Sequence, residues 1–193
     1  ILSHDTRDVP FLPTEGHFFE MSYEQVFGSY DYPRGEVDFR KYFLMKERAD
    51  GSGRHTLSYG LRLGITGSQT PIFENYFAGG FSTMRGFDFR GASPKDQGVV
   101  VGGELRFLGS VEYMVPLTAD DMLRGVFFTD FGTVEEQLSI HREDFRAVVG
   151  FGLRVSVPMM GPAPLALDLA FPLVREDTDD IRNFSFFFGF GRL

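Results

Sequence analysis

Alternation of apolar and polar residues with a period of two is the feature that most constrains how this chain can fold. In segment 55–66 the apolar residues fall at every second position, and they are Leu57, Tyr59, Leu61, Leu63 and Ile65. Successive side chains of a β-strand point to opposite faces, so this pattern predicts a strand with one apolar and one polar face. The pattern recurs at 18–27, 37–45, 103–117, 123–134, 145–157, 164–173 and 183–193. The chain is therefore predicted to be all-β, with about eight strands of about 10 residues in an antiparallel meander.

The two faces of these strands suit two different media. The polar faces carry charges in mid-strand, such as Arg62, Glu112 and Arg154, whereas the apolar faces are rich in the chain's 23 Phe. Strands of about 10 residues match the 9–11 that a tilted strand needs to cross a bilayer. No run of about 18 apolar residues is present, so a membrane crossing would need a closed β-barrel. The alternative at this point is a soluble all-β sandwich or barrel whose polar face meets water.

The connections between the predicted strands favour the membrane barrel. Short connections rich in Gly, Pro or Asp, at 48–54, 118–120 and 158–164, alternate with mostly longer and charged ones at 28–35, 67–98, 135–144 and 174–183. Transmembrane barrels have short periplasmic turns and longer external loops. No linker or second domain is evident, so residues 1–193 are expected to form a single barrel domain.

Composition excludes several classes of function. The net charge of −8 argues against a nucleic-acid partner, which needs clustered Lys and Arg. The chain has no Cys, and none of its four His lies within ligand spacing of another, so we expect no metal and no cofactor. We also expect no enzyme, although a Ser-His or Asp-His site assembled in space stays open. Gly150 and Gly152 precede no predicted helix, so they are expected to thin the inner face and not to bind phosphate.

Residues 76–91, YFAGGFSTMRGFDFRG, form the centre of a long loop that spans 67–98. Its aromatic content is not typical of disorder. Gly79, Gly80 and Gly86 allow positive φ and close backbone approach, which suits a loop folded back into a barrel lumen. Arg85 is surrounded by Phe, so it would lie largely out of water and would need a carboxylate partner. The alternative is that Arg85 is a solvated loop charge.

Five motifs in order along the chain resemble the BamA/TamA superfamily of outer-membrane assembly factors and transporters, also called the bacterial surface antigen family. They are DTRDVPFLPTEG at 5–16, FENYFAGGFSTMRGF at 73–87, GSVEYMVP at 109–116, GVFFTDFGTV at 125–134 and FSFFFGFGRL at 184–193. By resemblance, 5–16 precedes the ninth of the family's sixteen strands, and 73–87 is its sixth outer loop, which carries an Arg-Gly-Phe motif. Two departures are Met84, where many relatives have Val, and Leu193, where a terminal aromatic residue is common.

The resemblance also implies which residues matter. The lumen loop motif would be Gly79, Gly80, Arg85, Gly86 and Phe87, with Arg85 paired to Glu112 and Asp130. Both carboxylates lie on the polar faces assigned above, which is an independent check. The C-terminal β-signal, at the seam of the barrel, would comprise Phe184, Phe186, Phe188, Gly189, Phe190, Gly191 and Leu193. Glycines within a strand weaken it, which suits a seam that opens.

The length of the chain poses a separate question. The resemblance covers the C-terminal half of a sixteen-stranded barrel, and neither the first eight strands nor the periplasmic POTRA domains are in the sequence. The chain begins at Ile1, so we expect a processed or trimmed product. An eight-stranded barrel is filled by its own side chains and cannot hold such a loop. Three solutions stay open: a longer protein with the missing N-terminal half-barrel, two copies that close one barrel, or a stand-alone eight-stranded barrel with the loop over its mouth.

The function that the resemblance implies is that of a β-barrel insertase. It would sit in the outer membrane of a Gram-negative-type bacterium, or of an organelle of bacterial descent, and add client strands at a lateral seam without covalent chemistry. The expected partners are membrane lipid, client outer-membrane proteins and accessory assembly subunits. The alternatives are a TamA-like or two-partner-secretion pore for an exported polypeptide, or a purely structural barrel.

Overall fold

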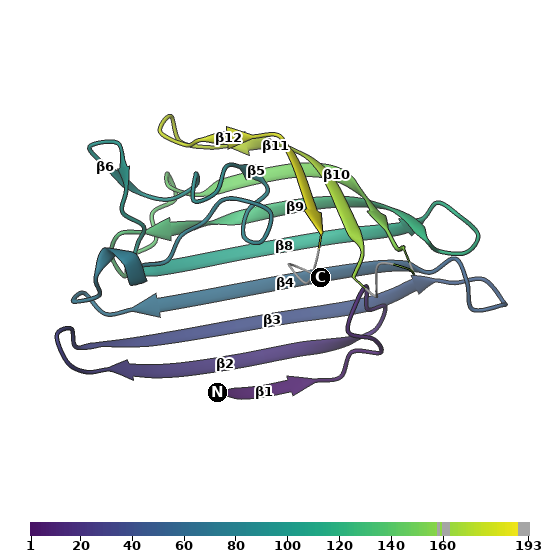
Figure 1. Ribbon diagram of the computed structural model, residues 1–193, viewed down its shortest axis with the longest axis horizontal. Coiled ribbons are helices and arrows are strands. Elements are labelled where there is room, and N and C mark those ends of the chain that lie inside the picture. The colour runs from purple at the N-terminus through teal and green to yellow at the C-terminus, as the bar shows by residue number, and fades with distance from the viewer. Residues whose placement is uncertain (158, 160–162, 189–193) are drawn as a thin grey trace.

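Nine antiparallel strands form one open sheet, in which the strands lie side by side in chain order (Figure 1). The computed structural model describes residues 1–157, 159 and 163–188. The strands are β1 (Leu2–Asp5), β2 (Gly16–Val26), β3 (Tyr32–Lys46), β4 (His55–Thr66), β8 (Leu105–Pro116), β9 (Leu123–Glu135), β10 (Arg146–Val155), β11 (Leu165–Val174) and β13 (Phe184–Phe188). The predicted all-β meander is confirmed, and the sheet is part of a barrel, with β1 and β13 at its two edges.

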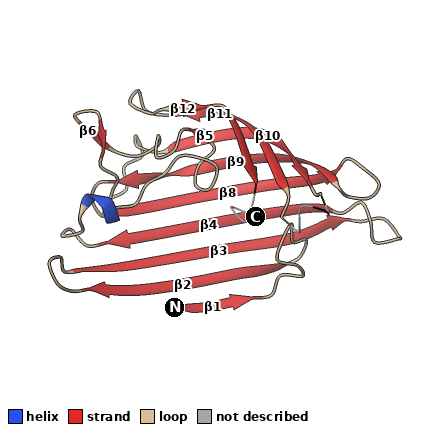
Figure 2. Ribbon diagram, in the orientation of Figure 1, coloured by secondary structure: helices blue, strands red, loops and turns tan. Residues whose placement is uncertain are grey.

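The segment between β4 and β8 carries the remaining short elements. They are the 3₁₀-helix η1 (Ile72–Glu74) and strands β5 (Gly86–Phe87), β6 (Lys95–Asp96) and β7 (Val99–Val100). β6 and β7 pair with each other, whereas β5 pairs with β12 (Ile181–Arg182), which precedes the last strand. Figure 2 shows this segment as irregular chain lying over one face of strands β8–β10. Within the described residues, no helix has the length and apolar character that crossing a membrane would require.

The largest differences between the observed strands of the sheet and the predicted ones lie near its N-terminal edge. β1 adds a short strand inside the segment that we expected to be a lead-in. β3 begins at Tyr32, five residues before its predicted start at Val37, so the β2–β3 connection is shorter than expected. We assigned Pro33 and Gly35 to a turn, but both pair with β2 because the antiparallel ladder continues past them. The ion pair between Arg34 and Glu36 near the start of β3 therefore belongs to the sheet.

The face of the sheet away from the loop is apolar and exposed. Its residues include Leu61, Leu63, Val111, Phe127, Phe151, Leu169, Phe171 and Phe186. Soluble monomers rarely leave apolar patches of more than a few hundred Å² uncovered. No second layer covers this face in the part of the chain that the structure describes, so the soluble sandwich is not the observed architecture.

The hydrophobic core lies between the loop and the inner face of the second half of the sheet. Loop residues Met84 and Phe87 pack with Leu108, Val126 and Phe128 from β8 and β9. Gly150 and Gly152 of β10 have the expected effect, because a Cβ at either position would collide with Phe128 or Asp168. These glycines thin the inner wall where the loop and its charged partners need space.

Candidate functional site

The loop reaches its position because glycines allow two close contacts. Gly79 has φ of 116°, and a Cβ there would collide with the backbone at Asp88 and Gly91. Gly86 has φ of 86°, and a Cβ there would press on the side chains of Val148 and Pro172 of the inner wall. Residues with a Cβ rarely adopt such angles, so glycine is required at both positions.

Hydrogen bonds within the loop fix its shape. The Ala78 N–H donates to Ser93 Oγ at 2.8 Å, and the Ala92 N–H donates to the Ala78 carbonyl at 3.0 Å. The Gly79 N–H donates to Thr83 Oγ1 at 2.9 Å, which closes the tight turn before Arg85. The loop is thus a folded element, as its aromatic content indicated.

The base of the loop is held by a stacked tyrosine. The guanidinium groups of Arg34 and Arg106 both lie over the ring of Tyr76, each 4.7 Å from the ring centre. Its hydroxyl donates to the Gly35 carbonyl at 3.2 Å, and its backbone bonds to Gly103. Cation–π contacts of this kind contribute about 0.5–2 kcal/mol each. They hold the base of the loop against β3 and β8, in addition to the contacts made by its tip.

Arg85 is the centre of a buried ionic cluster. Its side chain is fully buried and forms a bidentate pair with Asp130 of β9, with Nε–Oδ2 at 2.9 Å and Nη2–Oδ1 at 2.8 Å. Nη2 also lies 2.6 Å from Glu112 Oε1 of β8, and Nη1 lies 3.4 Å from Asp168 Oδ2 of β11. The guanidinium carbon stacks 3.4 Å from the centre of the Phe128 ring. The pairing that we expected with Glu112 and Asp130 is present, and Arg85 is not a solvated charge.

Two members of this cluster were not predicted from the sequence. Asp168 also binds Arg154 of β10, with Nη1–Oδ1 at 2.6 Å, and both side chains are buried. The signal was available in the segment LALDLA, where Asp168 is the one charge in an otherwise apolar strand and faces inward. A buried carboxylate needs a partner. The cluster therefore joins the loop to strands β8, β9, β10 and β11 at once.

The loop is also attached to the segment that leads into the last strand. Besides the β5–β12 pairing, the Asp88 N–H donates to the Asp180 carbonyl at 2.8 Å. Lys95 Nζ lies 2.8 Å from the Asp180 carboxylate. Phe81 stacks on Phe187 of β13 with ring centres 4.5 Å apart. None of these contacts was anticipated, because they join segments about a hundred residues apart.

The ladder between the last strand and β11 stops before β11 ends. The described residues of β13 pair with Leu165–Leu169 of β11, whereas β11 continues to Val174. Asn183 adds two bonds to Ala170, but residues 171–174 of β11 have no strand partner on that side among the described residues. Phe184 and Phe186 point outward and are exposed. Phe188 pairs through its backbone with Leu165, and Gly189, Phe190, Gly191 and Leu193 lie outside the described residues.

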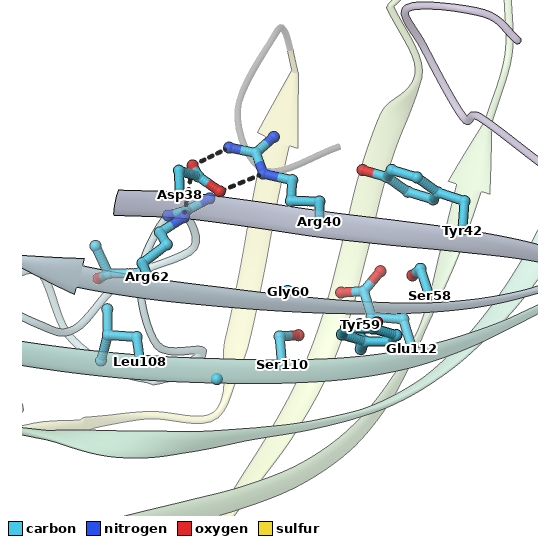
Figure 3. A pocket seen from close by; sticks show the side chains of 12 residues that line it. Asp38, Arg40, Tyr42, Ser58, Tyr59, Gly60, Arg62, Leu108, Ser110 and Glu112 are labelled. Carbon is cyan, nitrogen blue, oxygen red and sulfur yellow. Dashed lines mark hydrogen bonds and ion pairs between the residues drawn. The ribbon is translucent and has the colours of Figure 1, made fainter. Parts of the chain in front are cut away.

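The first half of the sheet has a different inner face, and its strands β3 and β4 line an open pocket together with β8 (Figure 3). Asp38 pairs with Arg40 at 2.6 Å and with Arg62 at 3.3 Å, and all three side chains stay about a quarter exposed. Arg62 Nη1 also donates to the Ser82 carbonyl at 2.6 Å, which ties the tip of the loop to β4. This wall is suited to contact with water.

Comparison with known proteins places the chain among outer-membrane barrels. The model of the Omp85 superfamily domain matches residues 2–191. The chain is 26% identical to the outer membrane protein assembly factor BamA of Nitratidesulfovibrio vulgaris, over 98% of this chain and 24% of that protein. It is 29% identical to the SAM50-like protein CG7639 of Drosophila melanogaster, over 64% of this chain and 28% of that protein.

A solved structure supports the fold. The crystal structure of BamA from Haemophilus ducreyi lacking POTRA domains 1–3 matches 95% of this chain and 40% of its own, with a TM-score of 0.80 and 21% sequence identity. The chain thus spans about a quarter of the length of these curated relatives.

Proposed function

Because this chain belongs to the Omp85 superfamily, we propose that it forms part of a barrel that helps to fold and insert other outer-membrane proteins. The chain is integral to an outer membrane. Its similarity to assembly factors of the BamA and SAM50 types supports an assembly role. The observation that carries the proposal is the end of the β11–β13 ladder at Leu169, which leaves residues 171–174 of β11 without a strand partner on that side among the described residues.

The mechanism that we propose uses the edge of the last strand. One edge of β13 pairs with β11, and no strand covers the other edge in the described part of the chain. An uncovered edge presents N–H and C=O groups in register for another strand. A client strand adds there through backbone hydrogen bonds, and the end of the β11–β13 ladder at Leu169 lets the edge move as it does so. No covalent step is involved.

The loop acts as a brace in this proposal. The Arg85 cluster fixes it to strands β8, β9 and β11, and the β5–β12 pairing extends that fixed point to the beginning of β13. The loop, held inside the lumen, therefore resists movement of β13. Glu112 and Asp130 hold the brace in place and take no part in bond making.

The experiment maps where a client strand binds. These 193 residues contain no Cys, so a single cysteine introduced here is the one reporter within this part of the natural protein. We would introduce Phe186→Cys or Ser185→Cys on β13 of the natural protein, and Val37→Cys on β3 as the matched control, since both neighbours of β3 are paired. Disulfide cross-links to a client with cysteines along its last strand are expected on β13, with a period of two along the client. Equal cross-linking at Val37→Cys, or none on β13, would contradict strand addition.

The position of the loop favours one alternative, a translocation pore. The loop covers the inner face of the second half of the sheet, where a plug would lie. Deletion of residues 76–91 would then raise the conductance of the natural protein in planar bilayers and leave client insertion unchanged. Under the assembly proposal the same deletion lowers client insertion.

A further inference from the structure

One histidine and two carboxylates, side chains that commonly bind metals, lie together at the C-terminal end of β9, apart from the Arg85 cluster. Glu135 is the last residue of β9 and its side chain is buried, whereas His141 and Asp144 lie in the following connection. His141 Nδ1 is 3.2 Å from Glu135 Oε2 and 3.7 Å from Asp144 Oδ2. One ligand atom from each residue lies within 4.8 Å of the others. Spacing along the sequence did not reveal this group, since only one His contributes to it.

The buried carboxylate is oriented by hydrogen bonds to its other oxygen. Glu135 Oε1 accepts from Thr133 Oγ1 at 2.8 Å and from the His141 N–H at 3.2 Å. Oε2 is thereby turned toward the imidazole. Carboxylates that bind metals are commonly held by outer hydrogen bonds in this way, and their loss weakens metal affinity. The arrangement therefore includes both the ligand atoms and the contacts that orient one of them.

The separations match those between ligands of a small divalent ion. Bonds of about 2.0–2.2 Å to a tetrahedral ion place neighbouring ligand atoms about 3.3–3.6 Å apart. The two distances from His141 Nδ1 are close to this value. Asp144 is more than a third exposed, so rotation of its side chain can close the remaining gap to Glu135.

We propose that Glu135, His141 and Asp144 bind a divalent transition-metal ion of the Zn²⁺ type. One imidazole with two carboxylates suits such ions, whereas Mg²⁺ and Ca²⁺ prefer oxygen ligands alone. The two carboxylates balance the charge of the ion. All three residues line an open pocket, together with Glu176 and Lys95, so the ion has a route in and water can complete its coordination. The ion would fasten the β9–β10 connection to the end of β9.

The competing reading is an ion pair in which a protonated His141 lies between two carboxylates. Burial and the neighbouring Glu135 raise the pKa of Asp144, and the hydrogen bond to Glu135 raises the pKa of His141. Such a group holds together without metal. The two readings differ in whether Zn²⁺ binds in a way that depends on these side chains.

The test is calorimetric titration of the natural protein with ZnCl₂ in detergent micelles, after chelator treatment and without a polyhistidine tag. His4 and His17 are stacked with their ring nitrogens 2.9 Å apart and could bind zinc too, so the titration is made in a His17→Gln background. We expect a site whose Kd rises at least about tenfold in His141→Gln and Asp144→Asn, and about tenfold in Thr133→Val. Excess Mg²⁺ should not compete.

Controls separate loss of the site from loss of the fold. Each variant should keep the far-UV circular dichroism and the heat-dependent gel mobility of the folded barrel, and Co²⁺ should give a visible absorption band that vanishes in His141→Gln. Zinc binding that is the same in folded His141→Gln and Asp144→Asn proteins would overturn the proposal. So would a complete lack of zinc binding in the His17→Gln background.

Discussion

The two halves of the sheet have the same alternating sequence pattern but different inner faces. In strands β1–β4 the inward charges form ion pairs that stay partly exposed, such as Asp38 with Arg40. In the second half the loop covers the inner face, and the inward charges Asp130 of β9 and Asp168 of β11 are buried against Arg85 of the loop. Alternation alone therefore predicts which residues face inward but not whether the inside is wet or dry. The loop makes that difference.

Burial changes what a charged pair contributes to stability. Exposed ion pairs contribute about 0–1 kcal/mol, because water solvates both partners well when they separate. Removing one partner of a buried pair costs about 3–5 kcal/mol, since the other charge is left without solvent or counter-charge. The same chemistry, Arg with Asp, should therefore respond very differently to mutation in the two halves.

The largest expected effect is that of Arg85→Ala. It leaves Glu112 and Asp130 without the cation that they share, while Asp168 keeps Arg154, so the free energy of unfolding of the natural protein should fall by about 3–5 kcal/mol. Arg40→Ala is the matched control in the open half and should cost about 1 kcal/mol or less, because Asp38 keeps its pair with Arg62. Urea unfolding in micelles, followed by far-UV circular dichroism, measures the loss of stability in both variants.

The same pair of variants tests the role of the loop as a brace. Client insertion into liposomes should fall in Arg85→Ala and stay close to normal in Arg40→Ala. Equal costs in stability for the two variants would show that the covered half is as wet as the open one. Normal client insertion by an Arg85→Ala protein that is clearly destabilised would show that insertion does not need the loop as a brace.

The next effect concerns the backbone of the loop. Gly79→Ala should cost about 2–4 kcal/mol, because strain at positive φ is added to a collision with the backbone at Asp88 and Gly91. Gly51→Ala, in the β3–β4 turn of the open half, has φ of 78° and nothing within 4 Å of the new Cβ, so it should cost about 1–2 kcal/mol. If the two costs measured by urea unfolding agree, the tight packing of the loop is not a source of stability.

The sequence predicted the faces of the strands, the folded loop and the pairing of Arg85 with Glu112 and Asp130. The faces follow from period-two alternation, which is a local property, and the pairing came from the resemblance. Asp168 and Arg154 were missed because their place in the cluster depends on the register between β10 and β11. The same holds for the β5–β12 pairing, which no local pattern encodes. The roles of the loop and of the β-signal in function stay predictions.

The smallest expected effect is a pH dependence in the open half. Asp8, in the β1–β2 connection, accepts hydrogen bonds from the Thr14 N–H at 2.9 Å, from Thr14 Oγ1 at 2.6 Å and from the Glu15 N–H at 3.3 Å. Burial opposes ionisation, but these bonds outweigh it and lower the pKa of Asp8 below its usual 3.8. The stabilisation is therefore present above the unfolded pKa and is lost as the pH falls through the lower folded pKa.

Asp8→Asn should reduce the free energy of unfolding by less than about 1 kcal/mol at pH 7, because the group is largely solvated. The difference between the natural protein and Asp8→Asn should shrink when urea unfolding is repeated at about pH 3. Asp31→Asn controls for general loss of negative charge. Asp31 lies in the β2–β3 turn, and its carboxylate accepts one hydrogen bond from Gln25. If Asp8→Asn lowered the free energy of unfolding as much as Arg85→Ala does, the β1–β2 connection would contribute as much stability as the buried cluster. The contrast between the two halves would then fail.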